Sequence, residues 1–349
     1  MSALLERSAG AAVVNSARRR SARRIRAVTA ALAGAVVLLF AVSILLGTYT
    51  VTIPDFFRIL GGEQIPGATY IVMESKLPRA VIGTMVGAAL GIAGSVFQTM
   101  LRNPLASPDI IGISYGASAS AVVGIVVFGA TGTTVSLAAL VGALVVALAI
   151  YLLSRRGGAA GYRLILVGIG FAAVMQAVVM FLMTRTDVRT ASQALVWLNG
   201  SLNSASWDRA GALAIGLLIL LPATAVLARR LRGLELGDDT AAGLGLHVEA
   251  SRLGLLITGV ALAAVATAAA GPVSFIAFLS GPIARRLLGG RHSLAASALV
   301  GSVIVLAADF AGSNLVPGVS LPVGVVTGAL GAPFLLWLLV TSNRVGRGG

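Results

Sequence analysis

The stretch LPRAVIGTMVGAALGIAGSVFQTMLRNPLASPDIIGISYGASA, residues 77–119, decides the fold of this chain. After Lys76 and Arg79 it runs apolar for about twenty residues, which is enough to cross a bilayer at about 1.5 Å per residue. Small residues recur there at every fourth position, at Gly83, Gly87, Gly91 and Ser95. A helix face so bare of side chains lets another helix approach closely in lipid. The stretch therefore predicts a closely packed membrane span, although a generic stripe for pairing two copies would look the same.

The span ends in a polar turn with two prolines, LRNPLASPD at 101–109. Ser107 is able to cap a following helix, Pro108 suits the first helical turn, and Asp109 would face the positive helix end. A second span is therefore expected from residue 110.

The order of these pieces resembles one permease family. Lys-Leu-Pro-Arg at 76–79, the glycine-rich span, Arg-Asn-Pro-Leu-Ala at 102–106 and Gly-Ile-Ser-x-Gly-Ala at 112–117 are similar to the signature of the FecCD family. LPVGVVTGALGAPF at 321–334 resembles the last span of that family, and the resemblance covers about 27 to 342. It implies a membrane subunit of an ATP-driven importer for ferric siderophores, haem or vitamin B12. The segments 184–188 and 197–203 resemble the ferric-siderophore branch.

The composition indicates an integral membrane protein. Of 349 residues, 57% are hydrophobic and only 11% are charged, whereas a soluble domain carries about 25% charged residues. The net charge of +14 lies in short connectors between apolar runs, which is typical of membrane topology and not of nucleic-acid binding. There is no cysteine, so disulfides and thiol chemistry are excluded.

The fold class expected is an all-α membrane protein with about ten transmembrane helices and, by resemblance, the type II ABC importer permease fold. The apolar stretches are 27–47, 80–101, 110–130, 133–154, 163–183, 211–228, 253–270, 273–288, 294–312 and 323–341. An even number places both termini on one side, and taking that side as cytoplasmic puts most of the 26 basic residues in inner connectors.

Three parts follow from this division. Residues 1–26, with seven arginines, are expected to be a disordered basic cytoplasmic arm, because the apolar run behind them is longer than a signal-peptide core. Residues 27–342 form the permease domain, and 343–349 a cytoplasmic tail. On the outer side, Thr52 and Pro54 predict a short helix, while Trp197 and Trp207 are typical headgroup-level residues.

The longest inner connector, 229–252, mixes leucines with acids and glycines. Asp238 or Asp239 is expected to cap a short helix that ends near Gly243. A solvated loop is the plain alternative, yet a loop without a partner has little reason to keep so many leucines. By resemblance this is the coupling helix that sits on the ATPase subunit. The residues assigned to ATPase coupling are Leu236, Thr240, Ala241, Leu244, Gly245 and His247.

The resemblance also implies a passage between two permease subunits, lined by the fifth and tenth spans. The candidate path residues are Gly168, Gly170, Met175, Gln176, Met180, Val326, Thr327 and Leu330. Helix-face arithmetic leaves open which of them face the passage. On the outer side, Lys76 and Arg79 match basic positions that, by resemblance, bind acidic residues of the binding protein. The alternative is that both side chains only extend to the polar membrane interface.

Chemistry for hydrolysis is missing from the sequence. Lys76 is the only lysine and no Walker loop exists, so ATP is expected to be used by a separate subunit, with no cofactor and no metal bound directly. His247 and His292 are interpreted as surface histidines. Asp309, the one acid within a predicted span, is either functional or a structural hydrogen-bonding group.

The sequence thus predicts a permease in a bacterial inner membrane, with three protein partners. They are an ATPase dimer, an extracytoplasmic siderophore-binding protein and a second permease, identical or paralogous. Vitamin B12 or haem as the solute stays open, and a stand-alone secondary transporter is the alternative from another class. Few intramembrane charges disfavour ion coupling, and no nucleophile, base or metal cluster supports a membrane enzyme.

Overall fold

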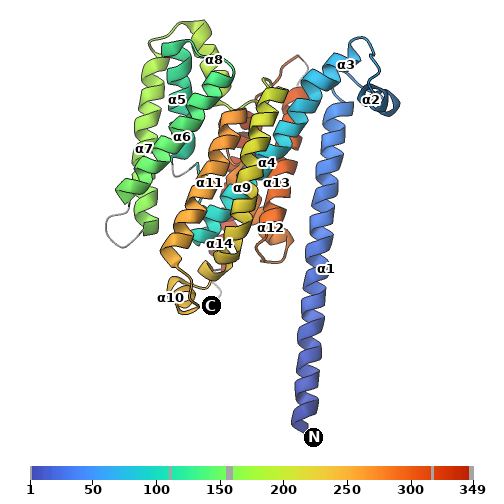
Figure 1. Ribbon diagram of the computed structural model, residues 1–349, viewed down its shortest axis with the longest axis vertical. Helices are drawn as coiled ribbons and strands as arrows, with labels where there is room; N and C mark the ends of the chain where they lie inside the picture. The colour runs from blue at the N-terminus through green and yellow to red at the C-terminus, as the bar shows by residue number, and fades with distance from the viewer. Residues whose placement is uncertain (1, 110–111, 155–159, 316–317, 346–349) are drawn as a thin grey trace.

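The computed structural model describes residues 2–109, 112–154, 160–315 and 318–345, and this part of the chain is entirely helical (Figure 1). The long helices are α1 (Ser2–Leu45), α4 (Leu77–Met100), α5 (Ile113–Phe128), α6 (Thr133–Ser154), α7 (Ala160–Met183), α9 (Trp207–Leu234), α11 (Val248–Ala270), α12 (Ile276–Leu287), α13 (Leu294–Asn314) and α14 (Val323–Val345). The short elements are α2 (Ile53–Leu60), α3 (Ala68–Tyr70), the π-helical turn η1 (Ile71–Lys76), α8 (Val188–Leu198) and α10 (Asp238–Gly243).

These long helices confirm the expected order of spans. Among the described residues, seven helices are long and apolar enough to cross a membrane, while α5 and the described apolar part of α14 are shorter. Helix α12 has 12 residues and lies within the eighth expected apolar stretch, 273–288, but it is too short to be counted among those seven. On the outer side α2 begins after Thr52, whose hydroxyl accepts the Asp55 backbone N–H at 3.2 Å, as expected of an N-cap.

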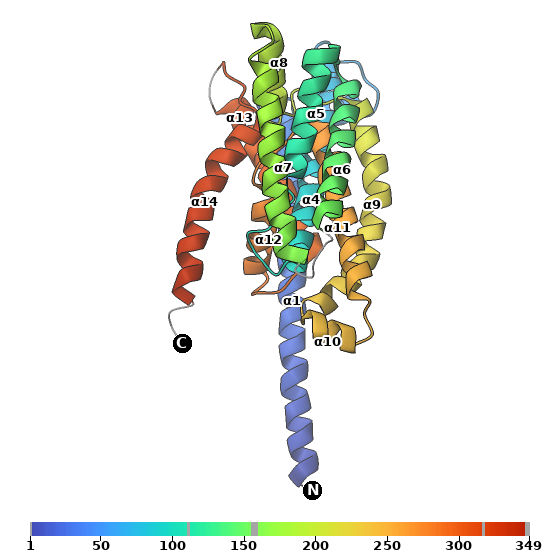
Figure 2. The same cartoon turned by 90° about the vertical axis from the view of Figure 1, so that its left-hand side faces the viewer.

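Helix α4 runs through the middle of the bundle and packs on α9, α11, α12 and α13 (Figures 1 and 2). Gly87 lies so close to α13 that an added Cβ would sit 2.5 Å from the Gly301 carbonyl oxygen. Gly91 and Gly94 lie equally tightly against the backbones of Ser297 and Ala277. The small-residue face of α4 therefore packs inside this chain, against α12 and α13.

Helices α5, α6 and α7 form a second group at one edge of the molecule, with α1 at the opposite edge (Figure 1). Helix α14 leans away from the body and packs on α13 and α12 (Figure 2). The two helices predicted to line a passage, α7 and α14, are thus peripheral helices of the single chain.

The expectation of a disordered arm at 1–26 is wrong for residues 2–26, because α1 begins at Ser2. The arm is rich in alanine and arginine, which favour helix, and no proline separates it from the apolar span. The helix of the first span therefore continues through the arm to Ser2. At the other end α14 reaches Val345. The tail positions 346–349, the inner connector at 155–159 and residue 110, the predicted start of a span, lie outside the described residues.

The predicted cap at Ser107 and Pro108 is also wrong. Helix α5 begins at Ile113, behind Gly112, whose φ of 92° is a left-handed conformation that glycine adopts readily. Asp109 does not cap a helix; its carboxylate accepts a hydrogen bond from the Ser114 hydroxyl. Residues 101–109 and Gly112, the described part of the chain between α4 and α5, are therefore not helical.

Candidate functional site

The connector between α9 and α11 is held in place by ion pairs and contains α10. Gly237, with φ 109°, is the residue that precedes the helix. The expectation that Asp238 or Asp239 caps it is therefore wrong. Asp238 instead accepts hydrogen bonds from Arg102 at 2.8 Å and Arg252 at 3.0 Å. Arg102 also donates to the Leu234 carbonyl at 3.0 Å. The polar turn after α4 and the connector are thereby joined.

The six residues assigned to ATPase coupling fall into two groups. Ala241 is fully buried at 0% exposure, while Leu236 and Leu244 are 61% and 65% exposed. Thr240, Gly245 and His247 are also exposed, and Gly245 has a φ of 80°. The connector therefore presents two leucines that this chain does not cover, on a surface fixed by buried Ala241 and by the ion pairs of Asp238.

On the outer side, Lys76 caps the end of α1. Its Nζ donates to three backbone carbonyls, those of Ile44 at 2.9 Å, Leu46 at 2.8 Å and Tyr49 at 2.6 Å. A cation at a helix C-terminus satisfies carbonyls that the helix itself leaves free. Lys76 therefore fixes the chain where it leaves the first span.

Arg79 forms a two-pronged ion pair with Asp309. Its guanidinium donates to the two carboxylate oxygens at 2.7 and 2.8 Å and to the Ser313 hydroxyl at 2.7 Å. The side chains are only 22% and 8% exposed. Of the two possibilities left open for Asp309, the structure shows the hydrogen-bonded one, between α4 and α13. Docking of a binding protein at Lys76 and Arg79 stays a prediction.

The candidate path residues differ in exposure. On α7, Gly170, Gln176 and Met180 are exposed, Met175 is half-buried and Gly168 is buried. On α14, Leu330 is exposed, Val326 is half-buried and Thr327 is fully buried. Most of the surface of α7 is uncovered by its own chain, although it is apolar.

A cavity of about 320 Å³ lies where α5, α7 and the turn before α12 meet. Asp109, Ser114, Gln176 and Ser274 give it a polar lining. Gln176 was a candidate from the sequence, whereas Asp109 was interpreted only as a helix-terminal charge. Its position behind two prolines was the available signal, because an irregular segment at membrane depth needs protein or water beside it.

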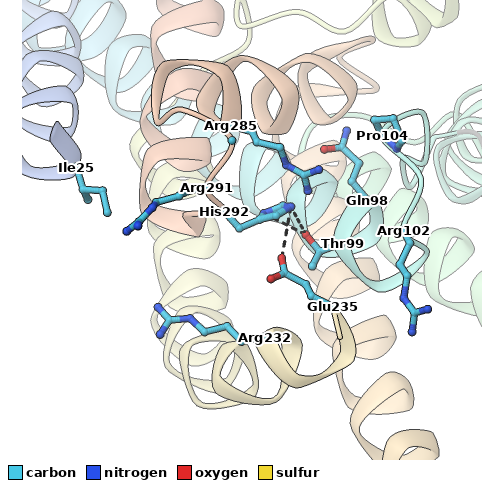
Figure 3. Close-up of a pocket in the computed structure, with 11 residues that line it drawn as sticks. Ile25, Gln98, Thr99, Arg102, Pro104, Arg232, Glu235, Arg285, Arg291 and His292 are labelled. Carbon is cyan, nitrogen blue, oxygen red and sulfur yellow. Dashed lines mark hydrogen bonds and ion pairs between the residues drawn. The ribbon is translucent and has the colours of Figure 1, made fainter. Parts of the chain in front are cut away.

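His292 is not the surface histidine that the sequence suggested (Figure 3). Its side chain is 17% exposed, its Nε2 lies 2.8 Å from the Thr99 hydroxyl, and Glu235 is 3.7 Å away. Burial, assisted by the nearby Arg285 charge, lowers the pKa of His292 to about 4. The ring is therefore neutral near pH 7. Its partners come from α4 and the end of α9, far away in sequence, so no local pattern could reveal them.

Comparison with known proteins agrees with this architecture. A solved metal-chelate type ABC transporter in an inward-facing conformation has the same fold, with a TM-score of 0.80 at 23% identity over 90% of this chain and 99% of that one. The protein is thus a multi-pass membrane protein with the fold of an ABC importer permease.

The family is shown by sequence as well. The model of the FecCD transport family matches residues 35–341. The ferric enterobactin transport system permease protein FepG of Escherichia coli is 42% identical over 85% of this chain and 91% of its own length. The achromobactin transport system permease protein CbrC of Dickeya dadantii is 40% identical over 83% and 84%. The chain belongs to the FecCD transport family, which confirms the resemblance.

Proposed function

We propose that this chain is the permease subunit of an ATP-driven importer that carries an iron(III)–siderophore complex across a bacterial inner membrane. The observation that carries the proposal is the 42% identity to the ferric enterobactin permease, which extends over most of both chains. The achromobactin permease supports the same class of solute.

A separate ATPase dimer supplies the energy in this proposal. The sequence holds no Walker loop. The uncovered Leu236 and Leu244 beside α10 suit insertion into an apolar cleft on such a subunit. The connector is also bound through Asp238 to Arg102, directly after α4. A movement of α10 that the ATPase causes would therefore be transmitted to α4, in the centre of the bundle.

A second permease covers the exposed face of α7, and the solute passes between the two subunits. Single apolar residues on α7, such as Ile169, Val174 and Met180, are more than half exposed. Lipid would cover these residues equally well, but it would not explain the polar Gln176 and the cavity beside it. An extracytoplasmic binding protein delivers the solute to the outer side.

The test is iron uptake in a bacterial strain that lacks its own ferric-siderophore permeases. The chain is expressed with its ATPase and binding protein, and the strain receives labelled ferric complexes of catecholate, hydroxamate and citrate type. We expect uptake of at least one of them, and none when the ATPase is omitted. Vitamin B12 or haem as the only accepted solute, or uptake without the ATPase, would overturn the proposal.

A further inference from the structure

Two adjoining cavities open at the end of the bundle that carries the basic connectors. The first, about 770 Å³, lies where the ends of α4, α9 and α12 meet the start of α13. The second, about 600 Å³, continues between α9 and α13. Ile25 of α1, Arg232, Glu235 and His292 line both. The two cavities therefore adjoin, and together they are called here the inner groove.

The first part of the inner groove is strongly basic. Arg232, Arg285 and Arg291 line it together with a single carboxylate, Glu235. None of these three arginines has an ion-pair partner among the residues that the structure describes. Arg102 also lines the cavity but is bound to Asp238. The excess of positive charge attracts an anion.

The charged groups are separated within the groove (Figure 3). Arg232 and Arg291 lie on the side of Ile25, toward α1, whereas Glu235 lies beside His292. His292 is neutral near pH 7 and adds a polar ring but no charge. An anion between Arg232 and Arg291 would thus meet two guanidinium groups and stay apart from the carboxylate.

The second part of the groove is mainly apolar. Ile92 of α4, Leu221, Ala225 and Ala228 of α9 and Leu294 of α13 line it. The small side chains of Ala225 and Ala228 leave room for a slender apolar group along α9. Arg24 of α1 donates to the Leu287 carbonyl at 3.1 Å and so ties α1, which carries Ile25, to the end of α12. One wall of the groove is fixed by this bond.

We propose that the inner groove binds an anionic phospholipid of the inner leaflet, with its phosphodiester at Arg232 and Arg291 and an acyl chain along Leu221 to Ala228. A guanidinium group matches the geometry of a phosphate, and basic pockets between membrane helices on the cytoplasmic side suit anionic headgroups. A free phosphate would use only the basic part. The inference does not depend on which solute the permease carries.

The test measures lipid binding to the purified, delipidated protein. Phosphatidylglycerol or phosphatidylcholine is added in detergent micelles, and the lipid retained is counted by native mass spectrometry alongside the thermal unfolding midpoint. We expect the wild type to prefer phosphatidylglycerol, and Arg232→Gln/Arg291→Gln to lower that preference by about tenfold or more. Ala225→Trp should weaken retention of both lipids, because it fills the apolar part.

The matched control is Arg163→Gln/Arg230→Gln, which removes the same charge from exposed positions that do not line the groove. It should keep the preference for phosphatidylglycerol. Equal retention of the two lipids by the wild type would overturn the proposal. The proposal would also be overturned if inorganic phosphate alone stabilised the protein as much as phosphatidylglycerol does, because the groove would then be a phosphate site. It would likewise be overturned if Arg232→Gln/Arg291→Gln lost only the binding of its ATPase, because the groove would then be a protein-binding site.

Discussion

Arg79 and Asp309 illustrate, at the scale of single residues, how a predicted binding residue acquires a structural role. A pair that is only 22% and 8% exposed depends on both partners, because removal of one leaves the other charge buried without compensation. The sequence identified both residues as unusual but could not pair them, since they lie on α4 and α13 and no local spacing connects them.

We predict that Asp309→Ala lowers the stability of the detergent-solubilised protein by about 3–5 kcal/mol, the typical cost of breaking a buried ion pair. The control is Glu63→Ala, which breaks an exposed pair with Arg58 at 2.9 Å and should leave the stability nearly unchanged. Thermal unfolding compares the two variants. Equal losses of stability in the two variants would contradict a structural role for the Arg79–Asp309 pair. Binding-protein assays of Arg79 variants must therefore use protein that is shown to be folded.

His292 is expected to make the stability of the protein depend on pH. Its pKa is lowered from 6.5 to about 4 in the folded protein, so between these values the unfolded state binds more protons than the folded state. This contribution to stability is complete above pH 6.5 and is lost as the pH falls toward 4. His292→Gln keeps a polar side chain that does not titrate, so its unfolding midpoint should fall less over that range. Identical pH profiles for the wild type and His292→Gln would exclude this origin.

At the scale of elements, the order of the spans could be predicted because most of the apolar stretches are long enough to recognise alone. What could not be predicted depends on three-dimensional context. The repeat of Gly87 and Gly91 showed that some helix packs closely, but not that α13 of the same chain does so. The start of α5 was misplaced because the Asp109–Ser114 bond and the left-handed Gly112 compete with the cap at Ser107.

The close approach of α4 to α13 can be tested with a single methyl group. A Cβ at Gly91 would overlap the Ser297 backbone, so Gly91→Ala should separate the helices and lower the yield of monodisperse protein severalfold. Gly211→Ala, in a helix position with open space around it, should be neutral or slightly stabilising. Size-exclusion chromatography measures both, and a normal yield for Gly91→Ala would refute the packing.

Two substitutions in the connector between α9 and α11 are expected to differ in their effect on the stability of the permease. Leu244→Arg should abolish co-purification of the ATPase while the unfolding midpoint stays near that of the wild type, because Leu244 is 65% exposed. Ala241→Arg should lower the midpoint as well, since Ala241 is fully buried. Leu60→Arg, an exposed leucine of α2 on the opposite side, is the control, and a normal ATPase yield for Leu244→Arg would remove α10 from the interface.

At the scale of the whole molecule, the structure combines a closely packed centre with two uncovered edges. Helix α4 packs on α9, α11, α12 and α13, whereas α7 (Figure 1) and α14 (Figure 2) stand at the periphery. A single chain of this shape leaves apolar surface on α7 that needs lipid or a second subunit. The family places it among transport permeases.

The proposal that this chain imports a ferric siderophore only when an ATPase drives it can be tested in proteoliposomes. The purified permease is reconstituted with and without its ATPase, and labelled ferric siderophore is supplied with its binding protein. We predict accumulation that requires ATP, the ATPase and the binding protein, and that Leu244→Arg abolishes. Accumulation by the permease alone, driven by a proton or sodium gradient, would contradict the claim and identify a secondary transporter.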